Sequence, residues 1–168
     1  MSNILIISAT SNNNLHLAEN IKSLADNENI NTELINLENY SLPLYTPEIY
    51  QNGVPENVHS LIDQFQKTDA FIVCAPEYNG SIPPIITNVI AWITVSTNQW
   101  REVFSGKVGL IATHSAGSGQ NFLRSMRIQL EHLGVIVLPR TIAVTNHTGF
   151  NSNSSRSKIK QLKKLIKP

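Results

Sequence analysis

The sequence predicts a three-layer α/β sandwich, in which a five-stranded parallel sheet carries helices on both faces. First, short uninterrupted apolar runs recur along the chain, and such runs are typical of strands that are buried on both faces of a parallel sheet. Second, stretches with helical spacing of apolar residues alternate with these runs, as in right-handed βαβ units. The 168 residues suit a single domain spanning 1–168, long enough to bury a real core.

Each expected strand is a short run rich in apolar residues. In chain order these runs lie at residues 3–8, 32–37, 70–75, 107–113 and 135–138. The third run is the clearest, because it is apolar throughout and stops abruptly at Pro76. After the second run, residues 40–47 are too rich in proline for regular structure.

Each expected helix carries its apolar residues on one face. The first follows a polar turn at 9–13, the second spans about 55–66, the third is a helix-like stretch at 85–92, and the fourth bears Leu123 to Leu133 and ends at Gly134. Residues 151–157 are polar and are expected to be flexible. A basic helix at about 155–167 then closes the chain. We expect this helix to pack inward, with a membrane-surface helix as the alternative.

Bulk properties exclude several classes of function. A net charge of +1 gives no support for a nucleic acid or a membrane as a partner. Cys74 is the single cysteine, so an intramolecular disulfide and a multi-cysteine metal site are excluded, and its apolar surroundings predict a buried thiol. The N-terminus shows no signal-peptide pattern, and no apolar run is long enough to cross a bilayer. We therefore expect a soluble, cytoplasmic protein.

Three polar loops are expected to meet at one edge of the sheet. In a parallel sheet of this topology, the loops after strands one, three and four converge at the carboxyl ends of the strands, where α/β proteins bind ligands. The first loop, at 8–14, combines hydroxyls and short amides with a helix start, which favours a phosphate. The same residues could instead simply cap the helix. The second and third loops, at 76–84 and 114–120, contain glycines that permit close approach of the backbone to a flat ligand.

The second loop carries the most specific motif in the chain, Pro76-Glu77-Tyr78-Asn79-Gly80-Ser81-Ile82-Pro83. This string resembles the signature of the NADPH-dependent FMN reductase family, a flavodoxin-like group that includes azo-, quinone- and chromate-reducing enzymes. The end of the first loop and the start of its helix, Asn14-Leu15-His16-Leu17-Ala18, also match the family pattern. The likeness extends through Asn88, Trp92 and the stretch after the third loop, and covers roughly residues 4–145.

The resemblance implies a flavodoxin-like strand order 2-1-3-4-5, bound FMN, and NADPH or NADH as co-substrate. A hydride would pass from NAD(P)H to FMN, and electrons would then go to a quinone, flavin, azo or similar small-molecule acceptor. No side chain is expected to be catalytic, because the flavin carries the chemistry. The residues expected to bind the cofactor are Ser8, Thr10, Ser11, Asn13, Asn14, Pro76, Glu77, Tyr78, Asn79, Gly80, Ser81, His114, Ser115 and Gly117.

Family members are usually homodimers or homotetramers, so the resemblance also implies an oligomer. Candidate contacts are Trp92, which could equally be core, Trp100 and the Tyr45 loop. The first loop departs from the family pattern: Ala9 replaces a glycine, the loop is shorter, and it contains no arginine. These departures leave the choice between NADH and NADPH open.

Two rival functions share this fold. A flavodoxin-type electron carrier would bind FMN without a nicotinamide substrate, but such carriers are typically acidic and lack this signature. A non-catalytic FMN-binding sensor would be compatible with the altered first loop. A serine hydrolase built on His114 and Ser115 is disfavoured, because neighbouring residues need not face each other and no nucleophile-elbow motif is present.

Overall fold

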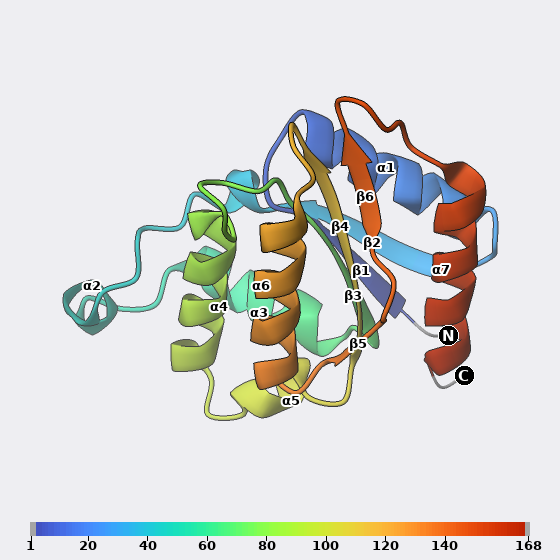
Figure 1. Cartoon of the computed structure of the whole chain (residues 1–168). Coiled ribbons are helices and arrows are strands. Elements are labelled where there is room, and N and C mark those ends of the chain that lie inside the picture. Colours follow the sequence, from blue (N-terminus) through green and yellow to red (C-terminus); the bar gives the residue numbers. More distant parts are fainter. Residues whose placement is uncertain (1–2, 167–168) are drawn as a thin grey trace.

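The computed structural model describes residues 3–166, which form one parallel sheet between two layers of helices (Figure 1). Its strands are β1 (Asn3–Ser8), β2 (Asn31–Asn36), β3 (Ala70–Cys74), β4 (Val108–Ser115), β5 (Ile136–Val137) and β6 (Ile142–Thr145). The strand order is β2-β1-β3-β4-β5, and β6 also pairs with β4. The predicted order 2-1-3-4-5 is confirmed.

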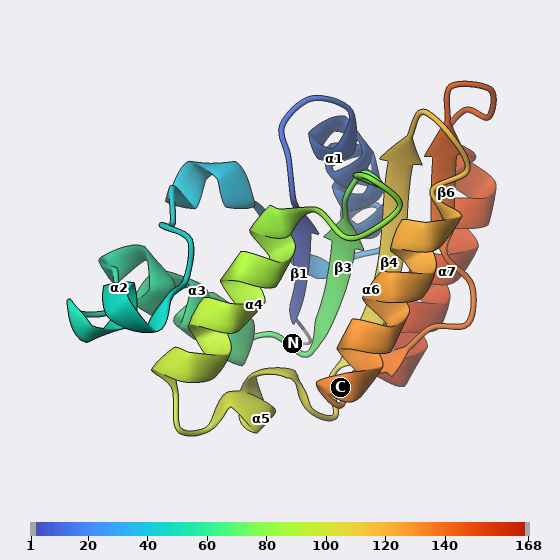
Figure 2. The same ribbon diagram turned by 60° about the vertical axis from the view of Figure 1, so that its left-hand side comes forward.

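Helices cover both faces of the sheet (Figures 1 and 2). One face is packed against α1 (Asn13–Asp26) and α7 (Ser152–Leu165), and the other mainly against α3 (Glu56–Gln66), α4 (Pro84–Ser96), α5 (Trp100–Phe104) and α6 (Gln120–His132). Two short elements, the 3-10 turn η1 (Leu37–Tyr40) and α2 (Pro47–Gln51), follow β2. The central strands β1 and β3 are buried on both faces, which explains their continuous apolar sequences.

Two short strands, β5 and β6, pair with β4 where the sequence predicted a single fifth strand. The sequence predicted a strand at 135–138, but only Ile136 and Val137 pair with the start of β4. Pro139 cannot donate a hydrogen bond to a sheet, so the pairing stops and resumes as β6, which the sequence reasoning missed. The guanidinium of Arg127 donates to the carbonyls of Leu138, at 2.6 Å, and Pro139, at 3.3 Å, and so supplies partners at the break.

Two further expectations were wrong in their boundaries. Residues 152–157 are helical, because α7 begins at Ser152 and Asn151 caps it by accepting a hydrogen bond from the Ser154 N–H at 2.9 Å. Residues 40–47 are not wholly irregular either, since η1 extends through Tyr40 and α2 starts at Pro47. The predicted end of the basic helix at residue 167 lies outside the described residues.

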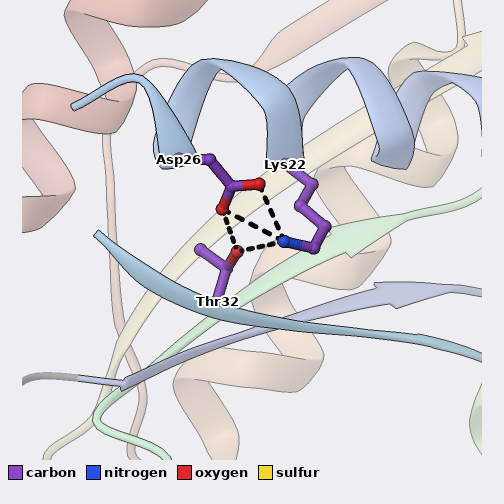
Figure 3. A network of polar contacts seen from close by, with 3 residues as sticks. All are labelled: Lys22, Asp26 and Thr32. Atoms are coloured by element: carbon purple, nitrogen blue, oxygen red, sulfur yellow. Dashed lines mark hydrogen bonds and ion pairs between the residues drawn. The ribbon is translucent and has the colours of Figure 1, made fainter. Parts of the chain in front are cut away.

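Polar contacts hold α1 to the neighbouring strand β2 (Figure 3). Lys22 Nζ lies 2.8 Å from Asp26 Oδ2, and the hydroxyl of Thr32 on β2 donates to Asp26 Oδ1 at 3.0 Å. The hydrogen bond from Lys22 lowers the pKa of Asp26. The network lies at the end of α1 that is remote from the loop joining it to β1.

The segment before α2 is fixed to α4 by two of the residues that resemble the family. Asn88 accepts from the backbone N–H of Tyr45 at 2.8 Å and donates to the carbonyl of Pro43 at 3.0 Å. The indole of Trp92 donates to the same carbonyl at 2.8 Å. Trp92 is fully buried, so it belongs to the core and cannot itself contact a partner subunit, which corrects one expectation.

Candidate functional site

A cleft of about 330 Å³ lies at the carboxyl ends of β1, β3 and β4, where the three polar loops converge. In Figure 2 this is the upper edge of the sheet, to which the heads of the β1, β3 and β4 arrows point. The residues that line it are Thr10, Ser11, Asn12, Asn13, Asn14, Glu38, Pro76, Glu77, Tyr78, His114, Ser115 and Ala116. The expected convergence of the loops is therefore present.

At the first loop, the N-terminal end of α1 lies at the cleft without a side-chain cap. Asn12, immediately before α1, makes no side-chain capping hydrogen bond within the described chain, and its backbone has a positive φ of 63°. Backbone N–H groups in the first turn of a helix have no partner inside the helix and attract anions. Ser8 is fully buried below the loop, and its hydroxyl donates to the carbonyl of Thr10 at 2.7 Å. Ser8 thus supports the loop without lining the cleft.

A carboxylate from η1, just after β2, contacts this loop. Glu38 Oε2 accepts hydrogen bonds from the backbone N–H of Ser11, at 2.9 Å, and from the Ser11 hydroxyl, at 2.5 Å. The amide of Asn36 donates to the same hydroxyl oxygen at 3.0 Å. Glu38 was not among the predicted site residues. The available signal was its position just after β2, whose carboxyl end reaches the same edge of the sheet as the end of β1.

The second loop contains a tight two-residue turn. Tyr78 and Ser81 exchange backbone hydrogen bonds of 3.2 and 2.9 Å, and the residues between them, Asn79 and Gly80, have φ values of 49° and 71°. Asn-Gly is the sequence most suited to such a turn, because both residues must adopt positive φ. The turn leaves Tyr78 48% exposed beside the cleft. An exposed aromatic face in this position can stack on a flat ligand.

Glu77 connects the second loop to the third. Its Oε2 accepts from the backbone N–H groups of Asn121, at 2.9 Å, and Phe122, at 3.2 Å, in the first turn of α6. The carboxylate therefore caps α6 in place of Gly119, which has no side chain. The backbone N–H of Glu77 donates to Ser115 Oγ at 2.9 Å. Glu77 lines the cleft, and its carboxylate also holds the loops together.

The third loop is positioned by hydroxyls and by one essential glycine. Ser115 is buried, and its hydroxyl lies 2.8 Å from that of Thr113. Gly119 has a φ of +66°, and a Cβ there would lie 2.7 Å from Thr113 Cγ2. At Gly117, by contrast, an added Cβ would have no described atom within 4 Å of it. Gly117 lies outside the cleft lining, although its neighbour Ala116 lies within it.

Most of the predicted site residues reach the cleft. Those that line it are Thr10, Ser11, Asn13, Asn14, Pro76, Glu77, Tyr78, His114 and Ser115. Those outside its lining are Ser8, Asn79, Gly80, Ser81 and Gly117. The sequence reasoning missed Asn12, Glu38 and Ala116 as lining residues. Cys74 is buried at the end of β3, and burial raises the pKa of its thiol, so it is no reactive group of this site.

The chemistry of the cleft suits a flavin mononucleotide. Hydroxyls and an open helix start provide donors for a phosphate at the first loop, and an exposed tyrosine ring provides a flat apolar surface at the second. The volume of about 330 Å³ falls within the range of about 300–1,000 Å³ that is usual for small-molecule sites. The fold and the cleft together define a flavodoxin-like protein with a polar cleft at the carboxyl edge of its sheet.

Comparison with known proteins gives the family. Residues 2–149 match the NADPH-dependent FMN reductase family, and the chain belongs to it. The chain is 35% identical over 77 residues to a quinone reductase of Escherichia coli, and 36% identical over 76 residues to an NAD(P)H-dependent FMN reductase of Pseudomonas aeruginosa. Each match covers 45% of this chain, and 39% and 40% of the two relatives, so the chain is matched to about two-fifths of their length.

A solved structure shows the same fold over nearly the whole chain. The flavoenzyme NAD(P)H:(acceptor) oxidoreductase of Paracoccus denitrificans superposes with a TM-score of 0.79 and 20% identity, covering 99% of this chain and 97% of that one. The resemblance seen in the sequence is thus confirmed. At the level of the family, so are FMN as cofactor, NAD(P)H as co-substrate and the reductase class.

Proposed function

We propose that this protein is an FMN-dependent NAD(P)H oxidoreductase whose cofactor binds in the cleft formed by the three loops. The observation that carries the proposal is the convergence of an open helix start, the Tyr78 ring and the small residues around Ser115 on a single cleft. When bound there, FMN would supply the chemistry, accepting a hydride from NAD(P)H and passing electrons to a small-molecule acceptor such as a quinone, a flavin or an azo compound.

The side chains have positioning roles in this proposal. Thr10, Ser11 and Asn13 would hold the phosphate end, together with the N–H groups at the start of α1. Pro76 to Ser81 would follow the ring and its ribityl chain, and Tyr78 would lie against the ring. His114 and Ser115 would border the ring from the third loop, with Gly117 allowing close approach. The cleft would leave room for flat acceptors of several kinds.

We further propose that the chain acts as a single FMN-binding domain of 1–168 in the cytoplasm and assembles as a homodimer or homotetramer. Within residues 3–166, no helix combines the length and apolarity needed to span a bilayer. We expect self-association to involve α2 and its flanking loops, which project from the body of the molecule (Figure 1). There Leu44 is 70% exposed and Tyr50 is also exposed, and the neighbouring Val95 of α4, whose carbonyl accepts from the Tyr50 hydroxyl, is exposed as well.

The proposal is tested by an anaerobic visible-absorption titration of the FMN-reconstituted protein, first with NADPH and then with NADH. We expect prompt bleaching of the bound oxidised flavin, and the better donor shows the effect of the arginine-free first loop. Perturbed flavin bands that neither donor bleaches would indicate an electron carrier or a sensor instead. If no flavin binds, the assignment of the cleft is wrong.

A further inference from the structure

We infer that Glu38 is a specificity residue that competes with the phosphate of FMN for the first loop. This inference rests on the proposed function, because it concerns the same cleft. Glu38 Oε2 accepts from both the N–H and the hydroxyl of Ser11, the residue two positions before the start of α1. These two donors are of the kind that a phosphate oxygen would use at this place.

Hydrogen bonds with Asn36 fix the position of Glu38 relative to Ser11. The N–H of Glu38 donates to Asn36 Oδ1 at 3.2 Å, and the Asn36 amide donates to Ser11 Oγ at 3.0 Å. Asn36 therefore links the backbone of Glu38 to the side chain of Ser11. The Glu38 carboxylate, which binds Ser11 directly, completes a closed set of hydrogen bonds among the three residues. Asn36 is buried, and it is the last residue of β2. The contact between Glu38 in η1 and Ser11 is thus tied to the end of β2 through Asn36.

Competition follows from the hydrogen-bonding properties of the two groups. An ionised carboxylate and a phosphate dianion both accept hydrogen bonds and donate none, so they cannot share the donors of Ser11. Their charges also repel each other across the cleft. The first loop contains no arginine that could offset this repulsion. FMN binding therefore requires either that Glu38 leaves Ser11 or that the phosphate uses only the remaining donors of the loop.

A consequence is that the phosphate adds little to flavin affinity in this protein. Riboflavin has the same ring and ribityl chain as FMN but no phosphate, so Glu38 opposes FMN and leaves riboflavin unaffected. Removal of the negative charge from Glu38 should then improve FMN binding selectively. Because Glu38 is exposed, the effect is screened by salt.

The test compares the dissociation constants of FMN and riboflavin, measured by quenching of flavin fluorescence in the full chain. E38Q preserves the shape of the side chain and a carbonyl acceptor for Ser11, so the loop should keep its conformation. We expect E38Q to bind FMN about tenfold more tightly than the original protein, with riboflavin changed by less than about twofold. The FMN gain should shrink in about 1 M salt, where the Debye length falls to about 3 Å.

E33Q is the matched control, because Glu33 lies on β2, shortly before Glu38 in the chain, and faces solvent but does not line the cleft. It removes the same charge and should leave both affinities unchanged. An unchanged or weaker FMN affinity in E38Q would overturn the role of Glu38, and the flavin site would stand as long as the original protein binds FMN. Equal tightening of FMN and riboflavin would also overturn it, because the effect would not act through the phosphate. If neither flavin binds to any variant, the proposed function itself fails.

Discussion

The side-chain amide of Asn14 and the backbone of His114 exchange two hydrogen bonds. Asn14 Nδ2 donates to the carbonyl of His114, and the N–H of His114 donates to Asn14 Oδ1, both at 2.9 Å. Asn14 lies in the first turn of α1 and is only 3% exposed, whereas His114 belongs to the carboxyl end of β4, 100 residues later. The pair therefore fixes the relative position of two of the loops that line the cleft.

Asn14→Ala should destabilise the fold, because it leaves the backbone N–H and carbonyl of His114 without their partner. We expect the free energy of unfolding, measured by urea denaturation, to fall by about 2–3 kcal/mol. Asn20→Ala is the control, since Asn20 is exposed on the same helix and should change stability by less than about 0.5 kcal/mol. Equal effects of the two substitutions would show that the Asn14 contact is not a significant link.

The sequence was sufficient to predict the strand order of the sheet and the convergence of three loops at one of its edges. The apolar runs of β1, β3 and β4 identify strands that are buried on both faces, and a doubly wound parallel sheet brings their following loops to one edge. These features depend on local patterns, which is why sequence reasoning recovered them.

What the sequence did not reveal depends on contacts between distant segments. Glu38 is an exposed acidic residue in a 3-10 turn, and its importance arises only because Ser11 lies beside it in space. Glu77 lines the cleft as expected, but its capping of α6 depends on the approach of two loops. β6 is a strand of four residues, too short to stand out after Pro139. The polar, serine-rich start of α7 does not show the apolar spacing of a helix. Asn151, which caps α7, was the signal that could have located its start.

Glu77→Ala should destabilise α6 through the loss of its cap. The carboxylate accepts two N–H groups in the first turn of that helix and also interacts favourably with the helix dipole. We expect a loss of about 1–2 kcal/mol in the free energy of unfolding, with Glu77→Gln at a smaller loss because it keeps an acceptor but not the charge. Glu33→Ala serves as the control at an exposed carboxylate. No difference between the alanine variants would exclude the capping role.

Gly119→Ala and Gly117→Ala should separate folding from cofactor approach. At Gly119 the positive φ and the 2.7 Å clash with Thr113 Cγ2 predict a loss of about 1–3 kcal/mol in thermal or urea unfolding. Gly117→Ala should leave stability within about 0.5 kcal/mol, because the added methyl group meets open space. If Gly117 borders the flavin, this stable variant should bind FMN more weakly. Unaltered FMN affinity would remove Gly117 from the proposed site.

At the opposite edge of the sheet, Lys107 should make stability depend on pH in the alkaline range. Its Nζ donates to the carbonyls of Phe65 and Gln66 at the end of α3, at 3.1 Å for Gln66. Burial lowers the pKa of Lys107 from 10.5 to about 8. Between these two values the unfolded chain holds more protons at this residue than the folded chain does, so the contribution of Lys107 to stability rises with pH. Below pH 8 both states are protonated, and the cost of burying the charge is fully present.

The prediction is checked by comparing the original protein with Lys107→Met at several pH values. Between about pH 7.5 and 9.5, the difference in the free energy of unfolding should move in favour of the lysine by on the order of 1 kcal/mol, less than the full linkage value because the amine is partly exposed to solvent. Other groups that titrate in this range are common to both proteins and cancel in the difference. The hydrogen bonds lost in the methionine variant add an offset that depends little on pH. A difference that stays flat, or that moves in favour of methionine, would mean that the folded protein does not depress the pKa of Lys107.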